Sequence, residues 1–262
     1  MMPSRRSPRV AVFPNDRAAA RALAGRIADA VQKNPRLVLG LPTGRTPVAL
    51  YDELVSLHAH GRLDLLQVTT FNLDEFVGIP ASHPGSYRSF MDDHLFSRVN
   101  VDRARVDFLR GDAADLDAEC ARYECAIAAA GGIDLQVLGI GTNGHIGFNE
   151  PARELQSRTH RVRLRPETRR ANAALFGGNV DAVPEEALSM GMATILQARA
   201  IVLLATGRSK ASCVERVIAG PLTTDLPASF LQLHHAVDVM LDAAAAERLG
   251  RSPAGARRSG DA

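Results

Sequence analysis

The stretch Gly139-Ile140-Gly141-Thr142-Asn143-Gly144-His145-Ile146-Gly147-Phe148-Asn149-Glu150-Pro151, or GIGTNGHIGFNEP, follows a short apolar run from Ile133 to Leu138. The apolar run predicts a buried strand, so the glycines begin where the strand ends. Their G-x-G-x-x-G spacing matches a dinucleotide-binding fingerprint, which also needs a helix that starts at the glycines. Gly147, Asn149 and Pro151 interrupt any helical pattern. The stretch therefore predicts a ligand-binding loop at the carboxyl end of a strand, without a dinucleotide.

Apolar strand-like runs alternate with amphipathic segments on both sides of this loop. The alternation predicts an α/β fold with a mostly parallel sheet and helices on both faces. Strands are expected near residues 37–39, 68–71, 106–109, 133–138, 200–204 and 237–241. Helices are expected at 16–33, 46–58, from 86, 116–130, 184–198 and from 209, with Thr46 as the cap of the second helix.

Length and charge limit the organisation of the chain. Its 262 residues, 46% of them hydrophobic, suffice for one α/β catalytic domain over residues 1–250. The tail 251–262 has three Arg and one Asp, so its charge of 3 − 1 = +2 accounts for the whole net charge of +2. We expect this Gly-, Ser- and Ala-rich tail to be disordered. No apolar run is long enough to cross a membrane, and no signal segment precedes the domain, so we expect a cytoplasmic protein.

Aromatic residues and cysteines argue against several classes of function. Tryptophan is absent and aromatic residues make up 5% of the chain, with no basic stripe among them, which argues against a nucleic-acid partner. Cys120, Cys125 and Cys213 lie within helical patterns and are odd in number. They predict reduced core thiols, neither a disulfide framework nor a metal site.

Two strand-to-helix turns can bind an anion. In GLPTGRTP (residues 40–47), the backbone N–H groups around Thr43 and Gly44, with Arg45 beside them, point toward a bound anion near a helix start. The turn TGRSK (206–210) adds the ammonium group of Lys210. Either turn alone is equally well explained as a tight structural connection. Together, at one edge of a sheet, they favour a phosphorylated small molecule.

Acid–base chemistry has candidates on two other loops. Asp74 and Glu75, in FNLDEF, follow a predicted strand, and since adjacent residues point to opposite faces, at most one of them faces a site. An acidic pair in this position is more often a solvated turn. His145 lies within the glycine loop, with Glu150 close enough to orient its imidazole. No second His stands at the spacing of a zinc ligand.

The motifs together identify the family that the chain resembles. LGLPTGRTP, TTFNLDEFVGIPASHPGSYRSFM, GIGTNGHIGFNEP, SRTHRV, VPEEALSMGMATIL and LQLHHAV are similar to segments of glucosamine-6-phosphate deaminases, which are grouped with 6-phosphogluconolactonases. The resemblance runs from about residue 37 to residue 242. It implies a Rossmann-like three-layer α/β sandwich.

The same resemblance implies a reaction and its residues. The family converts an amino-sugar phosphate and water into fructose 6-phosphate and ammonia, without a metal or an organic cofactor. Asp74 corresponds to the base that moves a proton between C2 and C1. His145 corresponds to the acid–base group that opens the sugar ring, supported by Glu150 and Asn143. The sugar-phosphate substrate is the expected partner, and the chain could form a homo-oligomer.

Three residues depart from the family pattern. Position 143 is Asn where many relatives have Asp, and Arg45 stands where Gly is usual. Ala174, in ANAALF, stands where an arginine that contacts the phosphate is expected. The choice of sugar therefore stays open. After Glu150, PARELQ replaces a serine-rich stretch, so activation by an acetylated sugar phosphate is not implied.

Two alternatives remain. The first is a 6-phosphogluconolactonase, although those enzymes have D-E-R and G-H-x-A-S-L-F-P where this chain has DEF and GHIGFNEP. The second is a non-catalytic sugar-phosphate sensor. The roughly 35 residues before the first predicted strand contain no helix-turn-helix for such a sensor.

Overall fold

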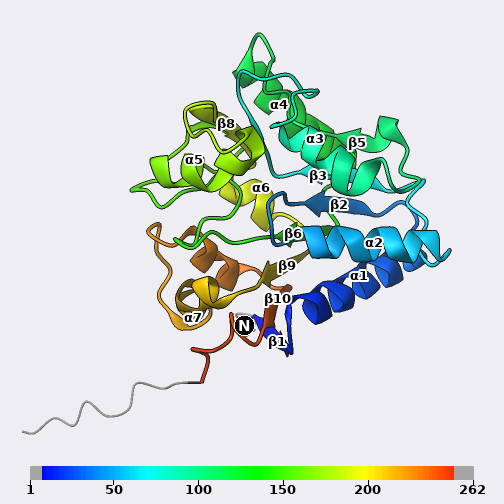
Figure 1. The fold of residues 1–262 in the computed structure, drawn as a ribbon, viewed down its shortest axis with the longest axis vertical. Coiled ribbons are helices and arrows are strands. Elements are labelled where there is room, and N and C mark those ends of the chain that lie inside the picture. Colours follow the sequence, from blue (N-terminus) through cyan, green and yellow to red (C-terminus); the bar gives the residue numbers. More distant parts are fainter. Residues whose placement is uncertain (1–7, 251–262) are drawn as a thin grey trace, which may run out of the picture.

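Seven parallel strands form the central sheet of the structure, a computed structural model that describes residues 8–250. The strands are β1 (Arg9–Phe13), β2 (Val38–Leu41), β3 (Thr69–Asn72), β5 (Val106–Asp107), β6 (Leu135–Leu138), β9 (Ala200–Ala205) and β10 (Val237–Asp242). Their order in the sheet is β1-β10-β9-β6-β2-β3-β5, which Figure 1 shows from the bottom of the view to the top. All the strand pairs are parallel.

Helices cover both faces of this sheet. They are α1 (Asp16–Lys33), α2 (Val48–Ala59), α3 (Tyr87–Met91), α4 (Leu116–Ala129), α5 (Pro166–Asn172), α6 (Met192–Leu196) and α7 (Ala211–Ala219). One apolar core contains the inward faces of α1, α2 and α3, and a second contains those of α4, α6 and α7. Alternate residues of β9 enter each core, Val202 the first and Leu203 the second, as in a sheet covered on both sides. The predicted three-layer α/β fold is confirmed.

The order of the strands sets the position of a binding site. From β2 the chain proceeds through β3 to β5 at one edge, and then returns to β6 on the other side of β2 before continuing to β9 and β10. The direction of winding therefore reverses between β2 and β6. In open α/β sheets, ligands bind at the carboxyl ends of the strands at such a reversal. The turn 42–47 follows β2 and the glycine loop 139–151 follows β6.

A second, smaller sheet was not predicted. Strands β4 (Asp74–Phe76), β8 (Glu186–Ser189) and β7 (His160–Arg163) pair antiparallel in the order β4-β8-β7. The helix predicted over 184–198 is wrong in its first part, because 186–189 form β8 and only Met192–Leu196 are helical. Backbone pairing of β8 with β4 and β7 outweighs the helical pattern of this segment.

Two other boundaries differ from the predictions. Strand β1 lies before the first predicted strand and pairs with β10 at the edge of the sheet. Its residues are mostly exposed, so it lacks the buried apolar run by which a central strand is recognised. Helix α2 begins at Val48 with Pro47 as its cap residue and without a side-chain cap, so the prediction of Thr46 as cap was wrong.

The prediction of buried, reduced cysteines is confirmed for two of the three. Cys120 and Cys213 are buried free thiols, but Cys125 on α4 is exposed and is not part of the core. The tail 251–262 lies outside the described residues. No helix in the range 8–250 is both long enough and apolar enough to cross a membrane.

Candidate active site

The glycine loop positions His145 by close backbone packing. A Cβ atom added to Gly141 would lie 2.3–2.6 Å from three atoms of the imidazole, so the ring occupies the space that a side chain would fill. Gly144 has φ +86°, a conformation that favours glycine, and a Cβ there would lie 2.1 Å from Leu226 Cδ1. The His145 side chain keeps 26% of its surface exposed. The loop therefore fixes the ring but leaves it accessible.

Glu150 lies at the other end of the same loop and faces His145. Its Oε2 atom is 3.4 Å from His145 Nδ1, an ion-pair distance without a well-aligned hydrogen bond. Asn143 Nδ2 donates to Glu150 Oε2 at 2.7 Å, and Thr168 Oγ1 on α5 donates to Glu150 Oε1. Burial alone raises the pKa of Glu150, but His145, Thr168 and Asn143 outweigh burial and lower it to about 2. Glu150 is therefore a carboxylate at neutral pH.

Asn143 supports the loop through two different groups. Its Oδ1 atom accepts from the backbone N–H of His145 at 3.2 Å, while its amide nitrogen binds Glu150. Asn143 thus contacts the main chain of His145 and the carboxylate that faces the ring. This arrangement needs an amide at position 143, because a carboxylate has no N–H to donate.

Asp74 reaches the same place from β4. Its side chain is buried, and its Oδ1 atom has no hydrogen-bond partner among the described residues. A Cβ on Gly147 would lie 3.7 Å from Asp74 Oδ2 and 3.0 Å from Ser189 Oγ, so the glycine loop lies directly against β4 and β8. Burial and the neighbouring charge of Glu75 raise the pKa of Asp74 to about 8. A buried carboxyl group without a partner is a typical acid–base catalyst.

Glu75 points away from this contact, toward the start of α3. Its Oε1 atom accepts from the N–H groups of Phe76 and Tyr87 at 2.8 and 2.9 Å, and its Oε2 atom accepts from that of Arg88 at 2.9 Å. Asp74 and Glu75 thus have different surroundings, as alternation along a strand requires. Only Asp74 faces the glycine loop.

Tyr87 connects β4 and the glycine loop to α5, and it was not among the predicted site residues. Its ring stacks on Phe148 of the glycine loop at 5.8 Å and packs on Phe76 of β4 at 4.6 Å. Its hydroxyl donates to Asn172 Oδ1 at 2.9 Å, and Thr43 lies near the same hydroxyl. Tyrosine at the start of a helix is common, so the sequence contains no signal for this role.

The turn after β2 approaches the turn after β9. Gly44 has φ +98°, which lets the backbone turn sharply there. Burial lowers the pKa of Lys210, and the nearby charge of Arg45 lowers it further. Within residues 8–250, neither cation pairs with a carboxylate. Asp242 instead accepts from the backbone N–H of Gly207 at 3.0 Å and holds the second turn in place. Two close cations without an acidic partner suit a phosphate group.

Ala174 lies in the short turn Ala173–Phe176 that follows α5, and its side chain is exposed. It supplies no polar atom to the site. The expected phosphate-contacting arginine is thus not present at position 174, and within residues 8–250 Arg45 and Lys210 are the cations of the two turns that pair with no carboxylate, since Arg208 pairs with Glu247.

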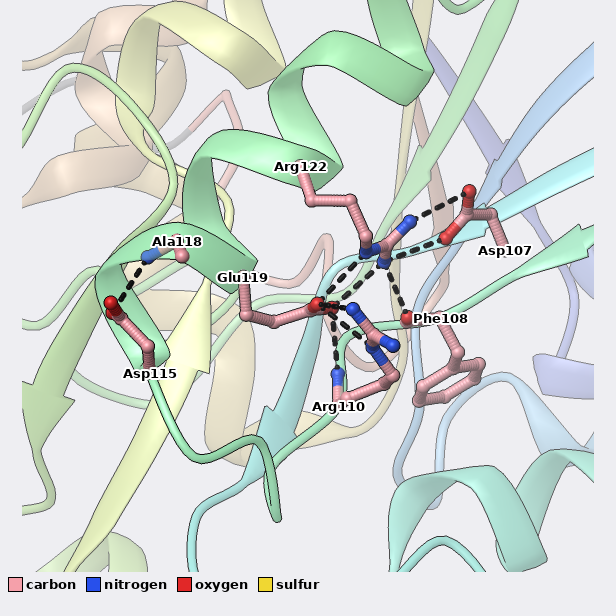
Figure 2. A network of polar contacts seen from close by, with 7 residues as sticks. All are labelled: Asp107, Phe108, Arg110, Asp115, Ala118, Glu119 and Arg122. Atoms are coloured by element: carbon pink, nitrogen blue, oxygen red, sulfur yellow. Dashed lines mark hydrogen bonds and ion pairs between the residues drawn. The ribbon is translucent and has the colours of Figure 1, made fainter.

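A network of ion pairs around Glu119 holds the loop that follows β5 (Figure 2). Glu119 on α4 lies between the guanidinium groups of Arg110 and Arg122, and Arg122 also pairs with Asp107 of β5. This network holds the loop 108–113, where a Cβ on Gly111 would lie 1.7 Å from the carbonyl oxygen of Phe76. Gly78 N–H also donates to the carbonyl of Gly111 at 2.9 Å. The backbone that follows Asp74 is therefore held between β8 and this loop.

The predicted site residues thus fall into two neighbouring groups. Asp74, His145, Glu150 and Asn143 gather where β4 meets the glycine loop, and Thr43, Gly44, Arg45 and Lys210 gather at the turns after β2 and β9. Tyr87 lies between the groups. Among residues 8–250, no three His, Cys, Asp or Glu side chains are placed to hold a metal ion.

Comparison with known protein families gives a match over most of the chain. Residues 16–240 match the family described as glucosamine-6-phosphate isomerases/6-phosphogluconolactonase. The chain is 48% identical over 224 residues to glucosamine-6-phosphate deaminase 2 of Bacillus subtilis, covering 85% of this chain and 90% of that protein. It is also 48% identical over 242 residues to the glucosamine-6-phosphate deaminase of Rhodopirellula baltica, covering 92% and 96%.

Solved structures agree with these matches. A monomeric glucosamine-6-phosphate deaminase superposes with a TM-score of 0.88 at 42% identity, covering 91% of this chain and 99% of that one. The 6-phosphogluconolactonase from Trypanosoma cruzi superposes with a TM-score of 0.74 at 22% identity, covering 95% and 100%. The second likeness shows a shared fold.

Proposed function

The chain belongs to the family of glucosamine-6-phosphate isomerases and 6-phosphogluconolactonases, and on that premise we propose that it is a glucosamine-6-phosphate deaminase. The reaction converts glucosamine 6-phosphate and water into fructose 6-phosphate and ammonia. One observation of the site carries this choice: Asp74, a buried carboxyl group whose Oδ1 atom has no hydrogen-bond partner within residues 8–250, lies against the loop that presents His145. An aldose–ketose shift needs such a carbon base beside an oxygen acid.

Each group of residues has a role in this proposal. The backbone around Thr43 and Gly44 and the cations of Arg45 and Lys210 bind the phosphate and fix the position of the sugar. His145 moves a proton between the ring oxygen and the C1 hydroxyl as the ring opens. Glu150 stabilises the protonated imidazole, and Asn143 holds Glu150 and the His145 backbone together.

Asp74 then acts on carbon. It takes the proton from C2 and returns it to C1, while one proton of the C2 ammonium passes to the C1 oxygen, which leaves a hydroxyl at C1 and a protonated C=N bond at C2. Water adds to that bond, and ammonia leaves, so that C2 becomes the ketone of fructose 6-phosphate. Each step moves protons among groups that the chain itself provides.

Relatives support the deaminase over the lactonase. The deaminases are 42–48% identical to this chain, whereas the T. cruzi lactonase is 22% identical. A non-catalytic sensor would have no need for a buried carboxyl group at position 74, because its Oδ1 atom has no hydrogen-bond partner within residues 8–250 and such burial is costly.

The test is a paired assay of ammonia and fructose 6-phosphate from the purified chain. Glucosamine 6-phosphate, galactosamine 6-phosphate, their N-acetyl forms and 6-phosphogluconolactone are compared, with Asp74→Asn as the matched inactive control. Equal amounts of both products from an amino sugar are expected. Lactone hydrolysis without ammonia would indicate the lactonase, and binding without any turnover would indicate the sensor.

Two predictions accompany this proposal, together with one property that is to be measured. Residues 1–250 form one catalytic domain, the protein is cytoplasmic, and its assembly state is to be measured by light scattering. A relative of similar structure is monomeric, so a homo-oligomer is not required for a site of this kind.

A further inference from the structure

Two carboxyl groups occupy adjacent positions on β4 and are both buried. Asp74 is 6% exposed and Glu75 is 2% exposed. Burial raises the pKa of Glu75 to about 7, although three backbone N–H groups, from Phe76, Tyr87 and Arg88, donate to its oxygens and favour its ionised form. Asp74 Oδ1 has no donor among the described residues. In the pair, Glu75 is therefore the better site for a negative charge and Asp74 for a proton.

The groups that face Asp74 do not offset the negative charge of Glu75. Tyr51 on α2, Tyr87 on α3 and Tyr123 on α4 are buried, and burial together with Asp74 raises their pKa values well above the usual value, so they stay neutral. On the facing loop, His145 is paired with Glu150. Arg88 approaches Glu75 from α3, but its guanidinium pairs with Asp92 at 3.1 Å.

The group that the substrate carries on C2 affects the ionisation of Asp74. A base that removes the proton from C2 lies next to whatever else C2 carries, and in an amino sugar that group is an ammonium at neutral pH. An ammonium beside Asp74 favours its ionised form. A hydroxyl in the same place has no charge and does not.

Building on the proposed function, we propose that Glu75 is a positioning residue that keeps Asp74 protonated in the empty site, so that the base is ionised only when a C2 ammonium binds. The proton balance is Asp74–COOH plus R–NH₃⁺ giving the pair Asp74–COO⁻ and R–NH₃⁺ plus one proton released to solvent. The site thus distinguishes an amino sugar phosphate from a neutral one by charge. A neutral hexose phosphate would bind through its phosphate and leave the base inactive.

The direct test uses two inert ligands that differ at C2 alone. They are 2-amino-2-deoxyglucitol 6-phosphate and glucitol 6-phosphate, which are open-chain alcohols and cannot react. Calorimetric titration of the wild-type protein at pH 7, in two buffers with different ionisation enthalpies, measures the protons released. The amino ligand is expected to release about one proton more than the neutral one. The phosphate group is common to both and cancels.

The variant Glu75→Gln tests the source of the effect. Its side-chain oxygen can still accept from Phe76 and Tyr87, while the charge is removed. The difference in proton release should fall below about a quarter of a proton, and the pH at which kcat/KM reaches half its maximum should fall by about one unit. Glu124→Gln is the matched control, because Glu124 is another acid of low exposure that accepts a backbone N–H, that of Thr159. It should behave as wild type.

The outcomes separate this inference from the proposed function. Equal proton release for both ligands in the wild type would overturn the inference while ammonia production still supported the deaminase. Unchanged proton release in Glu75→Gln would remove Glu75 from the role. If Glu75→Gln does not fold, Asp74→Asn serves in the same titration, because loss of the proton-bearing group must abolish the difference.

Discussion

Glu119 and Asp74 are both buried carboxyl groups of this chain, and they have opposite surroundings. Glu119 is 1% exposed, and its two oxygens accept from the guanidinium groups of Arg110 and Arg122 and from a backbone N–H. Burial raises its pKa, but the two arginines outweigh burial and hold it below the usual value. Among the described residues no cation pairs with Asp74, and burial together with the charge of Glu75 raises its pKa to about 8.

The difference indicates what each acid contributes. A buried charge that is fully paired stabilises structure, because the pairing offsets its desolvation. An unpaired acid costs stability and is retained where its proton is needed. The Glu119 network (Figure 2) holds the loop 108–113, in which Gly111 lies directly against the carbonyl oxygen of Phe76, two residues after Asp74. Removing Asp74 should therefore lower kcat, whereas removing Glu119 should lower the free energy of unfolding.

The largest effect on turnover is expected from Asp74→Asn. The variant should lower kcat by about 10²–10⁴, the usual range for loss of a general base, with affinity for a substrate analogue changed by less than a few-fold. Steady-state kinetics and a binding titration measure the two quantities. Retention of more than a tenth of the wild-type kcat would show that Asp74 is not the base.

A smaller loss is expected from His145→Gln, and it should depend on the form of the substrate. Since the imidazole acts on the ring oxygen, the closed pyranose should slow by about 10²-fold or more, and an open-chain analogue should slow less. Glu150→Gln should show the same bias more weakly, because Glu150 acts through His145. Equal losses on both forms would remove ring opening from the role of His145.

Substitutions in the turn 42–47, which we propose to bind the phosphate, should change KM without changing kcat. Arg45 and Lys210 provide cations where Ala174 provides none. Loss of a charge-assisted contact costs about 1.5–3 kcal/mol, or roughly 10- to 150-fold in affinity. Arg45→Gly should therefore raise KM at least about tenfold with kcat little changed, and adding Ala174→Arg should restore much of it.

The control for this prediction is Arg208→Gly, since Arg208 lies in the same second turn but pairs with Glu247. It should leave KM near that of the wild type. An unchanged KM in Arg45→Gly would mean that Arg45 faces solvent. A substrate other than a simple hexosamine 6-phosphate would then fit the turn better.

The pH profile offers a test without any substitution. Because Asp74 must be ionised to act, kcat/KM should rise about tenfold per pH unit below a midpoint near 8 and level off above it. The free energy of unfolding should instead decrease as the pH rises. The folded-state pKa lies above the ordinary value of 3.8, so the stabilisation is complete below about pH 4 and is lost as the pH rises through 8.

The comparison for stability is between wild type and Asp74→Asn. Denaturation by urea should show that the wild type loses stability relative to the variant as the pH increases from 6 to 9. A constant difference over this range would mean that the carboxyl group of Asp74 has an ordinary pKa.

The sequence predicted the central sheet because its strands are buried, and buried apolar runs between turns are recognisable. Edge strand β1 and the sheet of β4, β8 and β7 lack that signal, since β1 and β7 are largely exposed and β4 is three residues long. Strand order also follows from long-range packing. That order places the turn after β2 beside the loop after β6.

The candidate site likewise contains residues that the sequence identifies and residues that only the structure identifies. His145 and Asp74 stand in motifs whose spacing and residue types point to chemistry, and the structure places both at one junction. Tyr87 packs on Phe148 of the glycine loop and Thr168 donates to Glu150, both from helices, where a Tyr or Thr has many ordinary uses. Their roles depend on partners that are 18–85 residues away in the chain.

The smallest effect on turnover, and a clear effect on stability, is expected from Glu119→Gln. The substitution leaves two guanidinium groups without their carboxylate, but Arg110 and Arg122 are 62% and 33% exposed and can be partly solvated. The free energy of unfolding at pH 7 should fall by about 1–3 kcal/mol, less than for a fully buried pair. Since the folded-state pKa of Glu119 lies below 4.5, the difference should shrink as the pH falls below that value. The kcat should stay within about twofold, because Gly111 and β8 still hold the backbone after Asp74. A tenfold loss of kcat at unchanged stability would contradict the view that Glu119 serves stability and Asp74 serves catalysis. The Glu119 network would then be part of the machinery that positions the base.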